Sequence, residues 1–208
     1  KVKVTFTIIR LDEKHETTVV IPTRPGAGGS KFPFTDVGRS DDWYDAVKYL
    51  YENEIMNGTS DTLFSPNAEL TRGMVVTILY RMEGEPFTLG TKTFSDVKAG
   101  LYYSKAVEWA AENGVVNGFT DGTFKPDQAV TREQLASILR RYASFSGIAT
   151  YDAELPANAS VSNWAKKDVA WAYAEGILTS AQTAAAAKNA NRAEVAMAIY
   201  AYLTGTAR

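Results

Sequence analysis

An internal repeat is the feature that most constrains this chain. The segment TSDTLFSPNAELTRGM at residues 59–74 returns as TDGTFKPDQAVTREQ at residues 120–134, and residues 34–84 align with 94–144 at a shift of sixty without a gap. A sequence that repeats at a fixed period folds as copies of one supersecondary unit, and each copy needs its neighbours to bury its apolar face. We therefore expect the copies to share one core.

A third, degenerate copy follows the first two. VAWAYAEGIL at 169–178 resembles VEWAAENGVV at 107–116, and Asn191 stands sixty residues after Thr131. The loop between these segments has lost the Asp-Gly pair, the phenylalanine and the proline of the second copy. Three copies of unequal quality are therefore expected.

Each copy reads as a helix, a loop and a second helix. The first helix, expected over about 43–56, has apolar residues at helical spacing, namely Val47, Leu50, Tyr51 and Ile55. Asn57 and Gly58 follow, and both residue types adopt the left-handed conformation that closes a helix end. We expect the helix to end there.

The second helix of each copy begins with a side-chain oxygen at its N-cap, from Thr71, Thr131 and Asn191. Gln134 and Glu194 stand three residues later and can complete a capping box. The first copy has a methionine at that position, so its helix start is expected to be the weakest.

The first thirty residues have a different pattern. Val2, Val4, Phe6 and Ile8 alternate with mostly polar residues, and a β-branched run covers 17–21. This pattern predicts a β-hairpin, with His15 in its turn. An isolated hairpin is marginal in water, so it belongs to an upstream β region or packs on the bundle or on a second chain.

The predicted fold is thus mainly α, with three helix-loop-helix repeats in a compact bundle preceded by a short β-hairpin. The expected division is 1–32 for the hairpin and a Pro/Gly linker that ends an upstream region, 33–89 for repeat 1, 90–150 for repeat 2 and 151–208 for the degenerate repeat 3.

Composition excludes several classes of function. The formal net charge is −2 and no basic stripe is evident, so nucleic acid is not an expected partner. The apolar runs are interrupted by charges, so no membrane span is expected. Without cysteine, disulfides, thiol catalysis and cysteine-based zinc sites are excluded. The chain starts without methionine or a signal peptide, which we interpret as a fragment or a processed form.

An arginine follows each N-cap: Arg72, Arg132 and Arg192. A helix N-terminus is the positive end of the helix dipole, so a cation there is locally unfavourable and needs an anionic partner. Asp36 and Asp96 could supply it within the protein, and an anionic ligand is the alternative.

Aromatic residues stand near the start of the first helix of each copy: Trp43, Tyr103 and Trp164. They either pack in the core or stack on a sugar ring. Beside the arginines they suggest a groove for an acidic sugar.

Catalytic and metal sites have little support. Asp61 and Asp121 lack the run of oxygen ligands that calcium needs and are expected to form turns. Glu52 and Glu112 could be nominated as a glycosidase pair, but both are expected on solvated helix faces. No enzyme activity, cofactor or metal is therefore expected.

The pattern FTDV, an aromatic residue, a helix, an NG-x-x-D-x-x-F-x-P loop and a TR helix start resembles the S-layer homology domain over about 34–203. The resemblance implies three copies in a pseudo-threefold unit that binds a secondary cell-wall polysaccharide, often pyruvylated, in grooves between copies. It also implies a secreted protein at the bacterial cell wall or S-layer.

By matching to the family motifs, the resemblance implies a ligand-binding set: Asp36, Trp43, Gly58 and Arg72; Asp96, Tyr103, Gly118 and Arg132; and Trp164 and Arg192. Tyr103 replaces the usual tryptophan, and the third loop lacks glycine, so at least one groove is expected to be defective. Judged by the capping box and loop glycines of its own copy, Arg132 is expected to contribute most to binding and Arg192 least. A groove that borrows a loop from a neighbouring copy would rescue Arg192.

The rival hypothesis is a helical scaffold for protein–protein contact or S-layer assembly without glycan binding. In that case the arginines serve structural salt bridges and the hairpin is the interface, including one for self-association.

Overall fold

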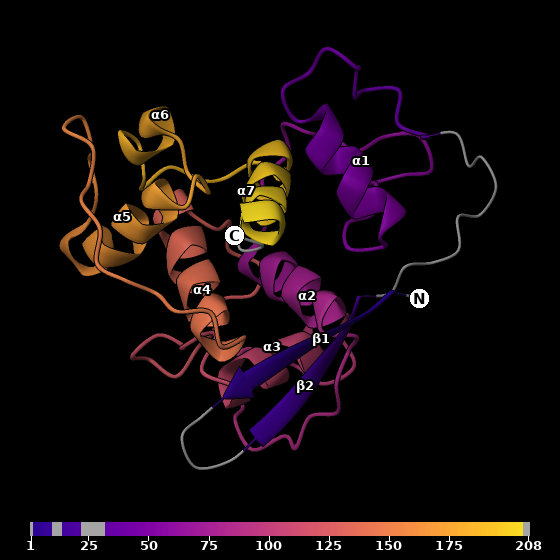
Figure 1. The fold of residues 1–208 in the computed structure, drawn as a ribbon, viewed down its shortest axis with the longest axis vertical. Coiled ribbons are helices and arrows are strands. Elements are labelled where there is room, and N and C mark those ends of the chain that lie inside the picture. Colours follow the sequence, from indigo (N-terminus) through magenta and orange to yellow (C-terminus); the bar gives the residue numbers. More distant parts are fainter. Residues whose placement is uncertain (1, 10–13, 22–31, 206–208) are drawn as a thin grey trace.

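The computed structural model describes the backbone of residues 2–9, 14–21 and 32–205, and side chains within 32–205. Two helices belong to each copy: α1 (Tyr44–Glu52) and α2 (Arg72–Met82), α3 (Ser104–Glu112) and α4 (Arg132–Phe145), and α5 (Lys166–Ala174) and α7 (Arg192–Gly205). A 3₁₀ turn, η1 (Asn163–Ala165), precedes α5, and the short helix α6 (Ser180–Thr183) lies between α5 and α7. Figure 1 shows α2, α4 and α7 meeting in the middle of the molecule. The mainly α fold is confirmed.

The predicted N-caps of the three central helices are confirmed. The side-chain oxygens of Thr71, Thr131 and Asn191 accept hydrogen bonds from the main-chain N–H three residues later. Side-chain oxygens of Gln134 and Glu194 accept a hydrogen bond from the main-chain N–H of their N-cap residues, which completes the capping box in the second and third copies.

In the first two copies, the first helix ends earlier than the sequence predicts. Helices α1 and α3 stop at Glu52 and Glu112, and not at the Asn-Gly pairs. The left-handed residue that turns the chain is Glu54 in the first copy (φ 60°) and Gly114 in the second (φ 70°). Because glutamate rarely adopts this conformation, the first-copy stop gives no local sequence signal.

Main-chain hydrogen bonds link the three copies into a closed ring. The N–H of Leu70 donates to the carbonyl of Ala190, that of Ala190 to Val130, and that of Val130 back to Leu70, at 2.8–3.2 Å. These residues are sixty apart in sequence and directly precede the three N-caps. The ring therefore gives the bundle its pseudo-threefold arrangement.

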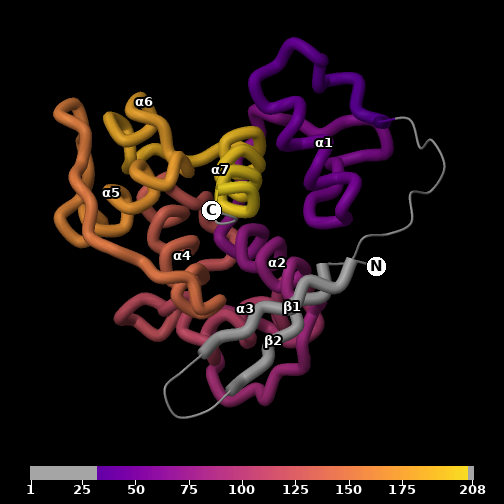
Figure 2. Tube along the Cα trace, viewed as in Figure 1, coloured from indigo at the N-terminus to yellow at the C-terminus, as the bar shows by residue number. Residues whose placement is uncertain are grey.

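Each outer helix packs on the central helix of the preceding copy. Helix α3 packs on α2, α5 on α4, and α1 on α7, so the first copy closes onto the last (Figure 1; Figure 2 follows the chain). At that closure the rings of Tyr49 and Tyr200 lie 5.3 Å apart in a T-shaped pair. The core is continuous through all three copies and includes Leu50, Leu79, Leu139 and Ile199.

At the N-terminal side, strands β1 (Val2–Ile9) and β2 (Lys14–Ile21) pair antiparallel, with Val2 opposite Ile21 and Ile8 opposite His15. His15 thus lies in β2 and not in the expected turn. The connecting residues 10–13 and the linker at 22–31 lie outside the described residues, so the complete hairpin stays a prediction. Within the described part of the chain, every helix is too short or too polar to cross a bilayer.

Candidate anion-binding grooves

The three arginines reach from one copy into the loop of the next. Arg72 Nε donates to the carbonyl of Phe124 in the second copy at 2.9 Å, and Arg192 Nε donates to that of Phe64 in the first copy at 2.6 Å. Arg132 Nη1 donates to the carbonyl of Ala185 in the third copy at 3.1 Å. The candidate grooves therefore lie between copies, and each arginine meets the loop of a neighbouring copy and not the loop of its own.

The helix N-termini themselves hold no free anion site. The main-chain N–H groups of Arg72 and Gly73 donate to the carbonyls of Gln128 and Pro126, and the N–H of Met74 donates to Thr71. The same bonds recur at the other two helix starts. An anion would thus meet the guanidinium groups and not the helix main chain.

Arg72 is a buried cation, and part of its guanidinium group is not hydrogen-bonded among the described residues. Its side chain stacks on Phe119 and Phe124, with Cζ 4.9 and 4.6 Å from the ring centres. Burial, with help from the neighbouring Arg141, lowers the pKa of Arg72 to about 10, while Asp96 opposes this shift. The guanidinium still carries its charge at neutral pH. Among the described residues, Nη1 and Nη2 have no hydrogen-bond partner.

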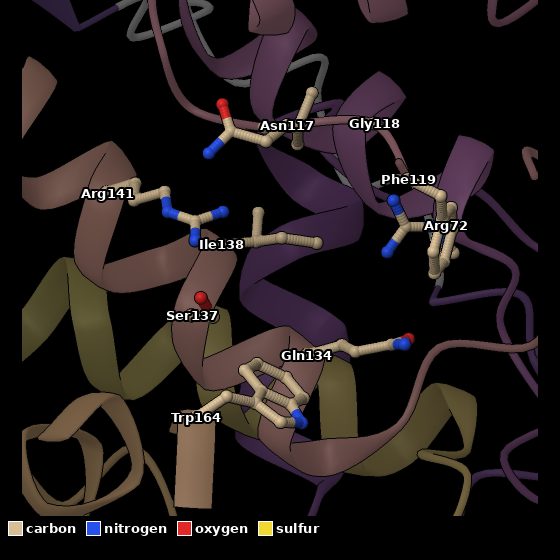
Figure 3. A pocket seen from close by; sticks show the side chains of 10 residues that line it. Arg72, Asn117, Gly118, Phe119, Gln134, Ser137, Ile138, Arg141 and Trp164 are labelled. Carbon is tan, nitrogen blue, oxygen red and sulfur yellow. The ribbon is translucent and has the colours of Figure 1, made fainter. Parts of the chain in front are cut away.

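A pocket of about 220 Å³ lies beside Arg72 and draws on all three copies. Its wall comprises Arg72 of α2, the loop 116–119, Gln134, Ser137, Ile138 and Arg141 of α4, and Trp164 of η1. Figure 3 shows Arg72 and Arg141 on opposite sides of Ile138, with Trp164 below Ser137. Two cations thus face one small cavity, together with an aromatic ring.

This pocket brings together three of the predicted site residues, each from a different copy: Arg72, Gly118 and Trp164. The Trp164 side chain is 57% exposed, so its face is open to a ligand. Tyr103 is 4% exposed and belongs to the core, and Trp43 is half-buried against it. Among the three aromatic residues, only Trp164 therefore lines this pocket.

The helix starts explain this difference. Trp43 and Tyr103 are the N-cap residues of α1 and α3, whereas the N-cap of α5 is Ala165. Trp164 corresponds instead to Tyr102, which is 58% exposed. A two-residue offset in the third copy hid this correspondence, and helix-start alignment would have revealed it.

Asp36 and Asp96 position the loops. The two oxygens of Asp96 accept the N–H groups of Phe124 and Lys125, and Asp36 holds Phe64 and Ser65 in the same way, all at 2.7–2.8 Å. Ser65 and Lys125 are left-handed, with φ of 58° and 57°. Neither aspartate hydrogen-bonds the arginine that its loop receives, so the direct salt bridge that the sequence left as one alternative is absent among the described residues.

The repeated glycines also have a packing reason. A Cβ on Gly118 would lie 2.7 Å from the carbonyl of Thr123 and would collide with the ring of Phe94. A Cβ on Gly58 would meet Phe34 and lie 2.6 Å from the carbonyl of Leu63. Close packing explains both glycines, although Gly118 also lines the pocket.

Two pocket residues were missed by the sequence interpretation. Ser137 is 3% exposed, and its Oγ has no hydrogen-bond partner in the described part of the protein. Arg141 faces the cavity without an ion pair among the described residues. Arg141 did carry a signal, since it repeats Arg81 at the sixty-residue shift.

The surroundings of Arg192 and Arg132 differ from those of Arg72. Arg192 is 9% exposed, stacks over Phe64 and donates through Nη2 to the carbonyl of Asn57 at 2.6 Å. Arg132 instead pairs with Glu194, with Nε–Oε2 and Nη2–Oε1 distances of 3.1 and 2.6 Å. One groove arginine is therefore neutralised by the protein itself.

The acidic residues considered for catalysis have structural roles. Hydrogen bonds from the Thr91 and Leu89 main chain lower the pKa of Glu112, the opposite of what a general acid needs. Glu52 lies 3.8 Å from Lys48 as an i,i+4 pair. Asp121 accepts from the N–H and hydroxyl of Thr123, which confirms its turn role. Residues 32–205 contain no acidic or histidine cluster suited to a metal.

Comparison with known proteins identifies related modules. Residues 33–73 and 93–136 match the model of the S-layer homology domain. An endoglucanase of Bacillus sp. (strain KSM-635) is 38% identical over 110 residues, which cover 53% of this chain and 12% of the relative. An amylopullulanase of Thermoanaerobacterium thermosulfurigenes is 31% identical over 180 residues, covering 82% of the chain and 9% of the relative.

A cellulosome-anchoring protein of Acetivibrio thermocellus is 26% identical over 140 residues, covering 64% of the chain and 30% of that relative. The chain thus spans only a small part of the relatives it matches. The match to the two enzymes covers about a tenth of their length, so it transfers no catalytic activity.

Proposed function

Since the chain belongs to the S-layer homology domain family, we propose that it anchors a larger protein to the bacterial cell surface by binding an acidic, pyruvylated wall polysaccharide in the grooves between its copies. The family is an anchoring module, and one relative is a cellulosome-anchoring protein. A location at the cell wall or S-layer follows from the same proposal, as does the presence of further domains in the parent protein.

The observation that carries this proposal is the pair of unneutralised guanidinium groups in one pocket. Arg72 and Arg141 present donors to the same cavity, and the exposed ring of Trp164 offers a stacking surface. A guanidinium group is opposite in charge to a carboxylate and complementary to it in geometry, and the face of an aromatic ring can stack on a sugar ring. An acidic sugar uses all three groups at once.

The size of the pocket fits one unit of a polymer. Pockets that enclose a complete small ligand are usually about 300–1,000 Å³, and this pocket measures about 220 Å³. It can therefore hold a charged group and part of one sugar while the polymer continues outside. Grooves linked on one body then gain avidity for a repeating ligand, by roughly 10²–10⁴ in favourable geometry.

Pull-down with purified cell-wall sacculi tests the proposal. The full chain should bind intact sacculi and lose binding after the polysaccharide has been stripped off. The Arg72→Ala, Arg141→Ala double variant should bind intact sacculi much more weakly, while Arg39→Ala, at an exposed position in the first copy, serves as the matched control. Equal binding to stripped peptidoglycan would refute the polymer as ligand.

Protein–protein contact is a second candidate, favoured by one surface feature. Phe87 and Leu89 are 89% and 75% exposed, yet their loop is fixed because Thr88 donates to Glu108 and the Leu89 N–H donates to Glu112. A Phe87→Ala, Leu89→Ala variant that loses wall retention with the arginines intact would favour this candidate.

A further inference from the structure

The residue three positions after the N-cap is charged in only one of the three copies. It is Met74 in the first, Gln134 in the second and Glu194 in the third, at intervals of sixty residues. This position faces the arginine of the preceding copy: Gln134 shares the pocket with Arg72, and Glu194 pairs with Arg132. In these two cases an arginine of one copy and the variable residue of the next copy lie together.

Glu194 occupies Arg132 completely. Its carboxylate receives Nε and Nη2, and Ala185 receives Nη1, so all three guanidinium nitrogens have protein partners. The two side chains are only 16% and 15% exposed, which shields the pair from solvent. An external carboxylate would have to displace an internal one that is already held in place.

Within residues 32–205, no carboxylate occupies Arg72 in this way. Its protein hydrogen bond uses Nε alone, and Gln134 brings a neutral amide to the position that Glu194 fills in the third copy. Arg192 is intermediate, because Nε and Nη2 are bonded to main-chain oxygens but no carboxylate pairs with it among the described residues. Both arginines therefore keep their charge available to a ligand.

We infer that Glu194 is a built-in carboxylate ligand that occupies Arg132, and that the charge at positions 134 and 194 decides whether Arg72 and Arg132, respectively, take an external anion. The chain then has two anion-binding grooves, at Arg72 and Arg192, and not three. This inference rests on the proposed function for the identity of the anion, but its test does not require the wall polymer.

The two capping boxes make a clean experiment. Gln134 and Glu194 each accept the N–H of their N-cap residue, at 3.3 and 3.2 Å, so either residue can cap either helix. Gln134→Glu and Glu194→Gln therefore change the charge of the groove and retain the cap. Gln134→Met, which copies the first repeat, is the neutral control for Gln134→Glu.

The probe is a methyl hexoside carrying a pyruvate ketal, titrated into the full chain with the arginine Nε–Hε signals followed by NMR. In the unaltered chain we expect Arg72 and Arg192 to shift and Arg132 to stay unchanged. Gln134→Glu should weaken the response of Arg72 about tenfold or more and leave Arg192 unaffected. Glu194→Gln should make Arg132 respond, while Gln134→Met, which adds no charge, should weaken the Arg72 response much less than Gln134→Glu does.

The outcomes separate the two proposals. A shift of Arg132 in the unaltered chain, an unaltered Arg72 response in Gln134→Glu, or no response of Arg72 to the probe would overturn the inference. If the charge exchanges behave as expected but the chain does not retain wall sacculi, the inference stands and the anchoring function fails.

Discussion

Arg72 and Asp96 hold opposite ends of one peptide group, that between Phe124 and Lys125. Asp96 Oδ2 accepts the N–H of Lys125 at 2.7 Å, and the carbonyl of Phe124 accepts Arg72 Nε at 2.9 Å. Asp36 and Arg192 flank the peptide between Phe64 and Ser65 in the same way. The aspartates thus align the oxygens that place the arginines.

Asp96→Ala should therefore act on the groove without touching the ligand. Two main-chain N–H groups lose their acceptor, which should lower the free energy of unfolding by about 1–3 kcal/mol. Binding of an acidic sugar should weaken because the Phe124 carbonyl is no longer fixed. Chemical denaturation and calorimetric titration measure the two effects. A variant with native stability and lost binding would instead favour direct ligand contact by Asp96.

Trp164→Ala should weaken sugar binding without affecting the fold. Trp164 is 57% exposed and lines the pocket, so loss of its ring removes stacking surface but little core. We expect a cost of about 1–2 kcal/mol, or roughly five- to thirtyfold in affinity. Tyr151→Ala, another exposed ring outside the pocket, is the matched control. Unchanged affinity for the wall oligosaccharide would remove Trp164 from the site.

Ser137→Ala should change stability and binding in opposite directions. The buried hydroxyl has no partner within the described residues, so its removal should leave the free energy of unfolding equal or higher by up to about 1 kcal/mol. If a ligand hydroxyl or carboxylate satisfies this group, affinity should fall roughly two- to tenfold. Thermal unfolding with and without ligand reports both. A parallel loss of stability and affinity would contradict this assignment.

Gly118→Ala should destabilise the second copy. The added Cβ would come within 2.7 Å of the Thr123 carbonyl, and overpacking of this kind costs about 1–3 kcal/mol. Gly38→Ala is the control, because its Cβ meets nothing closer than 3.7 Å. Denaturant unfolding followed by circular dichroism compares the two variants. Equal stability would show that the loop can relax and that its glycine serves another purpose.

The three arginines should separate into two classes. Arg72→Ala and Arg192→Ala should each reduce binding to wall polysaccharide, with Arg72→Ala the more severe because its groove also contains Arg141 and Trp164. Arg132→Ala should leave binding largely intact but lower stability, since it breaks the bidentate pair with Glu194. Affinity and unfolding measurements on the same preparations distinguish the classes. A dominant loss of binding in Arg132→Ala would restore the within-copy ranking.

Local features of the sequence predicted local structure well. The N-caps Thr71, Thr131 and Asn191 were identified correctly, because capping depends on residues only three positions apart. The end of the first helix was not, since Glu54 adopts a left-handed conformation under tertiary constraint. Because glutamate usually avoids this conformation, its presence at position 54 does not predict a helix end.

The composition of the groove could not be read from single copies. Arg72, Gly118 and Trp164 were each identified, but in three different repeats. Their meeting depends on each outer helix packing on the previous central helix, which no pattern within sixty residues encodes. Ser137 was missed for the same reason, whereas Arg141 was visible as the repeat of Arg81 but not as a neighbour of Arg72.

The ring of hydrogen bonds among Leu70, Val130 and Ala190 means that every copy contacts two others, so no copy is terminal in the folded bundle. Repeat proteins that stack in a line touch only their neighbours and can lose a terminal unit. A ring lacks that freedom, because deleting any copy opens two contact surfaces at once. We therefore expect all three copies to melt together, the weakest drawing its stability from the others. The number of copies is then fixed by the closed ring of hydrogen bonds. A chain with one copy fewer or one copy more would need a different architecture.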